Sequence, residues 1–406
     1  MHGVIFNKKI FPLSCSSLIS KTGDFAYEVA FALIAIELLS FEFFYLGIIY
    51  FFRFIPYLLF GPVGGWLADA FPQKYNMLGS DFLRFVIAAI LYFIYISGGL
   101  NIYILVISSM AMTIARSLFQ PSFRAYLPYV LEERDLPAGN SLLQLIEDVA
   151  SILGPLICSL IIASSEKSNV ICFYAVSYLL SIIFLLCLQV SRPGKHSSHF
   201  SCSVVFLEAR NTLVDICTRN QNLFMVVAGT SVCVLFVASL LRFVLPASII
   251  SIYGDEALVG YIFSLMSFGT VLGSLCYTWL VRCTTPIQLM KAWMVYGFLF
   301  LMVSIVIKFH LASVFVVVFF LGFSGAIVDI SIITNIQTLS VKGELGKNYG
   351  IYSTIANTCE AVSGLFSGVF SLLVGGASFS IISLLITLAA RAVIFKIKRV
   401  EHEKEK

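Results

Sequence analysis

Long apolar stretches alternate with short polar connections along almost the whole chain. A helix needs about 20 apolar residues to cross the hydrocarbon core of a membrane. We predict twelve membrane-spanning helices, at 11–38, 43–68, 78–97, 101–123, 139–164, 168–190, 222–250, 257–280, 287–307, 310–335, 349–373 and 376–397. The apolar stretches are continuous and do not alternate residue by residue, so helices are favoured over the strands of a membrane barrel.

One connection is much longer than the others. Residues 191–222 are polar and basic, and they separate six predicted spans from six. The sequence therefore predicts an N-terminal six-helix half at 1–190, a cytoplasmic linker at 191–222, and a C-terminal half with a cytoplasmic tail at 223–406. Two six-helix halves that rock around a site at the middle of the membrane are typical of secondary transporters.

Composition supports a membrane protein and excludes several other classes. The chain is 59% hydrophobic and 12% charged, whereas soluble domains are about 25% charged. The 10 cysteines form no C-x-x-C pair, so we expect no metal site, no disulfide framework and no cofactor. A net charge of +4 does not indicate a nucleic-acid partner. The polar loops hold no nucleophile–base arrangement, which argues against an enzyme.

The placement of Lys and Arg predicts the orientation of the chain in the membrane. Cytoplasmic loops carry an excess of these residues. Here they concentrate in the tails and in the connections that follow even-numbered spans, whereas the opposite loops hold only Lys167 and Lys308. Both termini are therefore predicted to be cytoplasmic.

Three charges interrupt the first span. Lys21, Asp24 and Glu28 are spaced three and four residues apart, which places them on one face of a helix. A charge at the centre of a bilayer costs about 2.5–3.5 kcal/mol on insertion scales, so each needs a partner or a water-filled cavity. Spacing predicts that Lys21 pairs with Asp24 and leaves Glu28 less compensated.

Further charges at membrane depth suggest proton coupling. A carboxylate in a low-dielectric site exchanges a proton near neutral pH, unless Lys or Arg holds it in the charged form. Glu28, Glu147 and Glu360 are predicted to be better carriers than Asp24. The full set of candidate coupling or cavity residues is Lys21, Asp24, Glu28, Glu147, Asp148 and Glu360. Arg53 and Arg242 are candidates for attracting an anionic substrate, or for neutralising these acids.

The stretch GPVGGWLADAFPQKYNML (61–78) follows the second span. Its glycines allow close helix approach, and Asp69 and Pro72 are expected to end the helix. It resembles the loop 2–3 signature of the major facilitator superfamily, matching it at Gly65, Leu67, Ala68, Asp69 and Lys74. The resemblance implies a conformational latch formed by Gly65, Asp69 and Lys74, to which we add the nearby Asp81 and Arg84.

Two later stretches carry the resemblance further. FQPSFRAYLPYVLEERDLPAGNSLLQ (119–144) resembles the branch that contains the enterobactin exporter and macrolide efflux pumps. VASILGPLICSL (149–160) resembles the span 5 motif of antiporters, with Gly154 and Pro155 in its Gly-Pro positions. The fold that this implies is an all-α membrane protein, the major facilitator fold.

The resemblance implies a function as well. It is that of a proton-coupled exporter of a siderophore, drug or other amphiphilic molecule in a bacterial inner membrane. The expected partners are the small-molecule substrate, protons and the lipid bilayer, and we expect a monomer. The same fold also serves importers of siderophores or other metabolites, and carriers that move lysophospholipids. A fourth alternative is a membrane receptor or scaffold that does not transport anything.

Overall fold

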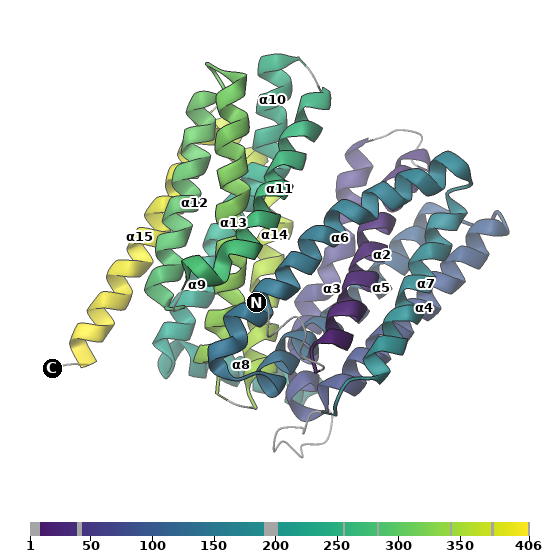
Figure 1. Ribbon diagram of the computed structural model, residues 1–406, viewed down its shortest axis with the longest axis horizontal. Helices are drawn as coiled ribbons and strands as arrows, with labels where there is room; N and C mark the ends of the chain where they lie inside the picture. Colours follow the sequence, from purple (N-terminus) through teal and green to yellow (C-terminus); the bar gives the residue numbers. More distant parts are fainter. Residues whose placement is uncertain are drawn as a thin grey trace. The chain divides into compact units, whose positions relative to one another are not determined.

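The computed structural model describes residues 9–38, 43–190, 202–254, 256–281, 284–341, 343–374 and 377–404. Helices form all of the regular structure in this part of the chain (Figure 1). They are α2 (Phe11–Leu38), α3 (Phe43–Ala70), α4 (Gln73–Ile96), α5 (Ile102–Val130), α6 (Leu136–Ser164), α7 (Ser168–Leu186), α8 (Cys202–Thr218), α9 (Gln221–Ser239), α10 (Leu245–Tyr253), α11 (Glu256–Leu280), α12 (Pro286–Val306), α13 (Leu311–Leu339), α14 (Leu345–Val374) and α15 (Ser378–Lys404). A short 3₁₀ helix, Glu133–Asp135, precedes α6, and a π-helix, Leu240–Val244, joins α9 to α10.

Each predicted span overlaps a helical segment, so the all-α prediction is confirmed. Within the described ranges, nine helical segments are long and apolar enough to cross a membrane. Helix α2 is not among them, because Lys21, Asp24 and Glu28 interrupt its apolar surface. Helix α3 ends at Ala70 and α4 begins at Gln73, as Asp69 and Pro72 predicted.

The predicted linker contains a helix that the sequence analysis did not expect. Helix α8 occupies Cys202–Thr218, and Asn220 caps α9 two residues later by accepting a hydrogen bond from the Leu223 N–H. Residues 191–201 of the linker lie outside the described part of the chain.

The chain forms two compact units. The first contains residues 1–210 and 341–354, and the second contains 211–340 and 355–406. Helix α14 therefore begins in one unit and ends in the other.

In the first unit, α2 packs against α6 and α7, while α5 packs against α3 and α4. Glycines set the distance between these helices. A Cβ on Gly154 would meet the backbone of α2 at Ala26, and one on Gly23 would overlap Ser177 of α7. Close approach of this kind brings the polar face of α2 within reach of side chains on both neighbours.

In the second unit, α13 packs against α11 and α12, and α15 packs against α9 and α12. The π-helix lies just before Pro246, and Leu245 N–H donates to the Leu240 carbonyl in its five-residue turn. Proline has no N–H to continue the normal ladder. A π-turn of this sort is frequent at functional sites, and this one carries Arg242.

Candidate functional site

The polar face of α2 is the centre of a charged cluster in the first unit. Lys21 Nζ lies 2.6 Å from Glu147 Oε1 on α6, and Arg124 of α5 lies 3.8 Å from the other carboxylate oxygen. The prediction that Lys21 pairs with Asp24 is therefore wrong: Lys21 reaches across to another helix. Glu147 is held by two cations, which favour its charged form and disfavour its protonation.

Glu28 is also firmly paired. Arg53 of α3 forms a two-pronged ion pair with it, with nitrogen–oxygen distances of 2.6 and 3.1 Å. The guanidinium lies 4.6 Å from the centre of the Phe31 ring, within range of a cation–π interaction. The expectation that Glu28 is the less compensated acid of α2 is wrong, and Arg53 serves first to neutralise it.

Asp24 has a partner of a different kind. The hydroxyl of Tyr178 on α7 donates a hydrogen bond to Asp24 Oδ1. Tyr174, one turn earlier on α7, lies beside Tyr178, with its oxygen 3.0 Å away. The Tyr174 ring stacks on Tyr27 of α2 at a centroid distance of 4.3 Å. A stack of aromatic rings from two helices thus holds the hydroxyl against the carboxylate.

Arg116 of α5 is the cation that completes this part of the cluster. It lies within electrostatic range of Asp24, Glu147 and Tyr57. No ion pair joins it to any residue in the described ranges, although its side chain is partly buried. Its guanidinium is therefore attracted to several acids without being held by one of them.

Asp81 and Arg84 on α4 form a second charged pair near Tyr178. They are 3.4 Å apart and fully buried, and Ser181 of α7 donates to Asp81 at 2.6 Å. Arg84 also lies 5.4 Å from the centre of the Tyr178 ring. We grouped both residues with the latch at Asp69, but their contacts in the described structure join them to α7 and to the Asp24 cluster.

Asp69 makes the contact that a latch requires. Its two carboxylate oxygens accept hydrogen bonds of 2.8 Å from the backbone N–H groups of Gly346 and Lys347, in the first turn of α14. The first N–H groups of a helix have no partner within it, and a carboxylate also interacts well with the positive end of the helix dipole. Asp69 therefore caps α14 from another helix.

Glycine makes this cap possible. A Cβ on Gly65 would lie 2.7 Å from the Gly346 carbonyl oxygen and 3.2 Å from Gly350 Cα. The backbones of α3 and of the first turns of α14 therefore touch directly, as small-residue helix pairs do. Lys74, the other predicted member of the latch, donates to the carbonyls of Leu186 and Leu188 at 2.6 and 2.8 Å, where α7 ends.

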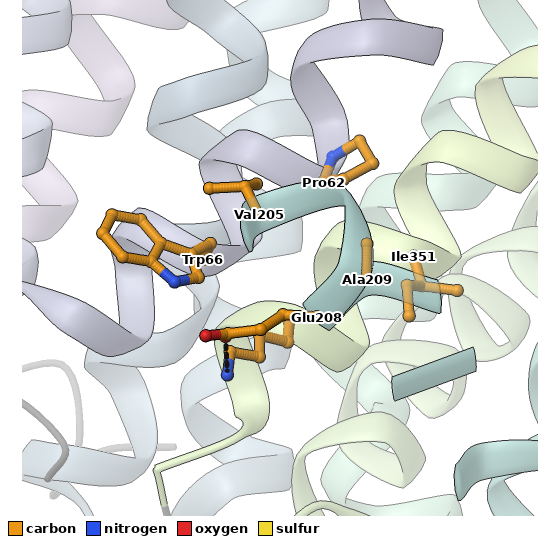
Figure 2. A pocket seen from close by; sticks show the side chains of 7 residues that line it. Pro62, Trp66, Val205, Glu208, Ala209 and Ile351 are labelled. Carbon is orange, nitrogen blue, oxygen red and sulfur yellow. Dashed lines mark ion pairs between the residues drawn. The ribbon is translucent and has the colours of Figure 1, made fainter. Parts of the chain in front are cut away.

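Helix α8 closes over the same contact. Glu208 of α8 lies 2.6 Å from Lys347 Nζ. Figure 2 shows this ion pair beside Trp66 of α3, with Val205 and Ala209 of α8 facing the same small pocket. The sequence analysis missed Glu208 because it lies in the stretch that was assigned to the linker at 191–222.

The remaining candidates are distributed between the two units. Asp148 of α6 is buried and accepts a hydrogen bond of 3.0 Å from Gln144, one turn earlier. In the second unit, Arg242 of the π-helix pairs with Glu360 of α14. Arg242 thus neutralises an acid, as Arg53 does, and Glu360 is not an isolated carboxylate.

The sequence analysis also missed Tyr174 and Tyr178, and it did not connect Arg116, a base in the fourth predicted span, with Asp24. A signal was present: two tyrosines spaced four apart share one face of a span. Because aromatic residues are abundant throughout the chain, with 18 Tyr and 37 Phe, the spacing alone did not distinguish this pair.

The structure combines membrane-crossing helices that carry paired charges with a glycine-lined contact between α3 and α14, which Asp69 caps. This combination is that of a polytopic transporter. The chain belongs to the transmembrane secretion effector family of the major facilitator superfamily, whose family model matches residues 5–406. It is a transporter and not an enzyme.

Curated relatives of the chain are efflux proteins. The chain is similar to macrolide efflux protein A of Enterococcus faecalis, with 21% identity over 178 residues, which is 44% of this chain and 54% of that protein. It is equally similar to macrolide efflux protein A of Streptococcus pyogenes, where the match covers 44% of the relative. The matched stretch thus spans about half the length of these relatives.

Solved structures show the same fold over nearly the whole chain. A bacterial homologue of the iron transporter ferroportin, in an outward-facing state, has a TM-score of 0.77 at 16% identity, covering 96% of this chain and 99% of that one. The human organic anion transporter MFSD10 has a TM-score of 0.76 at 14% identity, covering 95% and 99%. The major facilitator fold is therefore shown, and at these identities nothing finer follows.

Proposed function

We propose that this protein is a proton-coupled exporter of amphiphilic small molecules in a bacterial inner membrane, with both termini in the cytoplasm. The similarity to macrolide efflux proteins supports drug-like cargo and the outward direction. A siderophore has the same mixture of apolar and polar groups and belongs to the same class of cargo.

One observation carries the coupling mechanism. Glu28, Glu147 and Glu360 are each held by Lys or Arg, whereas Asp24 is held by the neutral hydroxyl of Tyr178. A carboxylate that is paired with a cation keeps its charge, while one that has a neutral partner accepts a proton at lower cost. We therefore assign the coupling proton to Asp24, in place of the three glutamates favoured by the sequence.

Protonation of Asp24 would change the interactions of Arg116. While Asp24 is charged, it attracts the Arg116 guanidinium, since the two lie within electrostatic range. Protonation of Asp24 removes that attraction and leaves Arg116 to interact with Glu147 or Tyr57. A proton and a cationic cargo molecule would then compete for the Asp24 carboxylate, which is what exchange transport requires.

The latch belongs to the same proposal. The cap that Asp69 places on α14 is a discrete contact, either made or broken, and a bistable contact of this kind can separate two conformational states. We assign Gly65, Asp69 and Lys74 to the stabilisation of one state of the transport cycle.

The experiment uses inverted membrane vesicles and a radiolabelled macrolide. We expect an acidic vesicle interior to drive accumulation of the macrolide by the unchanged protein. Asp24→Asn keeps the size of the side chain but cannot carry a proton, so it should abolish accumulation against a gradient and leave exchange of labelled for unlabelled macrolide intact.

Glu37→Gln is the matched control, because Glu37 lies on the same helix but is exposed and pairs with Lys167. It should leave proton-driven accumulation unchanged. Accumulation by Asp24→Asn at the normal rate would remove Asp24 from the coupling role. Macrolide transport by the unchanged protein that ignores the pH gradient would overturn proton coupling itself.

A further inference from the structure

Helix α8 exposes a row of large apolar side chains although it lies outside the predicted spans. Phe206 is 45% exposed, Leu207 54%, Leu213 42% and Val214 48%. Four such residues on one 17-residue helix are unusual for a segment surrounded by water.

These four residues share one face of the helix. Phe206 and Leu213 are seven residues apart, as are Leu207 and Val214, so each pair lies two turns apart along the same line. The exposed Cys217 lies one turn beyond Leu213. The opposite side of the helix carries Val205 and Ile216, which are buried. Helix α8 therefore has two apolar faces, of which only one is covered by protein.

The position of α8 along the chain fixes its depth in the membrane. Its first turns line one pocket with Pro62 and Trp66, in the C-terminal part of α3, and form the ion pair with Lys347 at the start of α14 (Figure 2). Its last residue, Thr218, is separated from α9 by only two residues, which span about 7 Å at most. A helix fixed in this way to the ends of membrane spans lies at the level of the lipid headgroups.

The charge on the uncovered face also fits a position at the level of the lipid headgroups. Arg210 lies between Phe206 and Val214, four residues from each, and is exposed. In the described part of the chain it makes no ion pair. A long basic side chain in an apolar face at a membrane surface extends along the acyl chains and places its charge among the phosphates.

We propose that α8 is an interfacial helix, which inserts Phe206, Leu207, Leu213 and Val214 among the acyl chains of the lipid leaflet nearest to it and binds a lipid phosphate through Arg210. The bilayer is the occupant of this face because α8 adjoins predicted membrane spans at both of its ends and because the one charge on the face matches the headgroups. Glu208 faces the other way, toward Lys347. The helix thus joins the membrane surface to the cap that Asp69 forms on α14.

The test measures membrane depth with spin labels in phospholipid nanodiscs. Labels are attached to single cysteines at positions 206, 213, 211 and 215, in a variant of the full chain whose native cysteines are replaced. We expect the labels at 206 and 213 to collide mainly with oxygen, which concentrates in lipid. The labels at 211 and 215, on the polar side, should collide mainly with a water-soluble nickel chelate.

Three results would overturn the proposal. The labels at 206 and 213 could be as accessible to nickel as those at 211 and 215, which would place the whole helix in water. They could be shielded from both reagents, which would indicate a protein partner on this face. All four labels could also collide more with nickel than with oxygen in nanodiscs, but not in detergent. That result would indicate that a lipid bilayer displaces α8 into water.

A second comparison tests Arg210. Arg210→Glu should shift the label at 206 from oxygen toward nickel, because a carboxylate is repelled by phosphates. Arg219→Glu is the matched control, since Arg219 is exposed and pairs with Asp215 on the polar side of the helix. Equal depths for label 206 in both variants would remove Arg210 from the lipid contact.

Discussion

Tyr178 occupies the place next to Asp24 that Lys21 and Arg53 occupy next to Glu147 and Glu28. A hydroxyl stabilises a carboxylate through a hydrogen bond but does not cancel its charge, so Asp24 stays dependent on the more distant Arg116. Lys and Arg on Glu147 and Glu28 do cancel the charge. The cluster therefore combines ion pairs, which join α2 to α3 and α6, with an Asp24 carboxylate that is hydrogen-bonded to a neutral hydroxyl.

The pair between Lys21 and Glu147 should be a stabilising contact. Removing one partner of a buried ion pair costs about 3–5 kcal/mol, because the other charge is left uncompensated. Lys21→Met and Glu147→Gln should each lower the melting temperature in detergent. The double variant should lose less than the sum, with a coupling energy of about 1–3 kcal/mol.

The exposed pair between Lys167 and Glu37 is the control for this cycle. Pairs at such positions contribute about 0–1 kcal/mol, so Lys167→Met and Glu37→Gln should be nearly additive. Additivity for Lys21 and Glu147 as well would show that their contact does not stabilise the fold.

Sequence reasoning found the acids and bases of this cluster but not their partners. Helical periodicity predicted that Lys21, Asp24 and Glu28 share a face, and they do. The partner of each depends on which helix packs against that face, and spacing along a single helix does not contain this information. Lys21 therefore pairs with Glu147 on α6, whereas the spacing along α2 had suggested Asp24.

At the scale of elements, α3 presents glycine to two neighbours. Gly61 and Gly65 meet the start of α14, while Gly64 meets the backbone of Ser117 on α5. Three glycines within five residues would weaken a helix in water. Here they permit backbone contact on two sides, which the side chains of larger residues would prevent.

Gly64→Ala should therefore destabilise the protein. The new methyl group would overlap the Ser117 carbonyl oxygen, and overpacking of this kind costs about 1–3 kcal/mol. Gly79→Ala, on α4, is the matched substitution, because nothing lies within 4 Å of its Cβ position. It should leave stability unchanged or raise it by about 0.5–1 kcal/mol, as measured by thermal unfolding. Equal melting temperatures for the two variants would contradict the close α3–α5 contact.

Hydropathy predicted the existence of the spanning helices better than their ends. Helix α4 begins at Gln73, five residues before the predicted span at 78–97, and α5 continues to Val130, beyond 101–123. An apolar stretch marks the part of a helix that crosses lipid, whereas the helix itself continues into polar surroundings. Helix α8 was missed for a related reason, since its 17 residues include Glu208, Arg210 and Asp215 and contain no long apolar stretch.

At the scale of the whole molecule, the two compact units divide between Arg210 and Asn211, inside the long polar connection, but one later segment belongs to the earlier unit. Residues 341–354, which follow the tenth predicted span, pack with residues 1–210. Contacts through Asp69, Gly65 and Glu208 account for this grouping. The proposed halves at 1–190 and 223–406 describe the order of the chain, and the latch adds one segment of the later half to the earlier unit.

Orientation is the property of the whole molecule that labelling can test directly. Cysteines introduced at Arg219 and His402, in a background without native cysteines, should react with an impermeant maleimide only in inverted vesicles. Cysteines at Ser165 and Lys308 should react in intact cells, because these exposed positions lie in the opposite loops. Reaction of position 219 or 402 from outside intact cells would reverse the proposed topology.

The charged cluster also has an electrical consequence. Away from the helix ends, α2–α7 carry five acids (Asp24, Glu28, Asp81, Glu147 and Asp148) and five bases (Lys21, Arg53, Arg84, Arg116 and Arg124). Moving one elementary charge through a membrane potential of 100 mV involves about 2.3 kcal/mol. Because these ten charges sum to zero, the helices can move within the membrane field without net electrical work. Under the proposed proton coupling, the voltage acts on the bound proton and the cargo alone. Exchange of a monovalent cation for one proton would then be indifferent to voltage, whereas export of a neutral molecule in exchange for a proton would be driven by it.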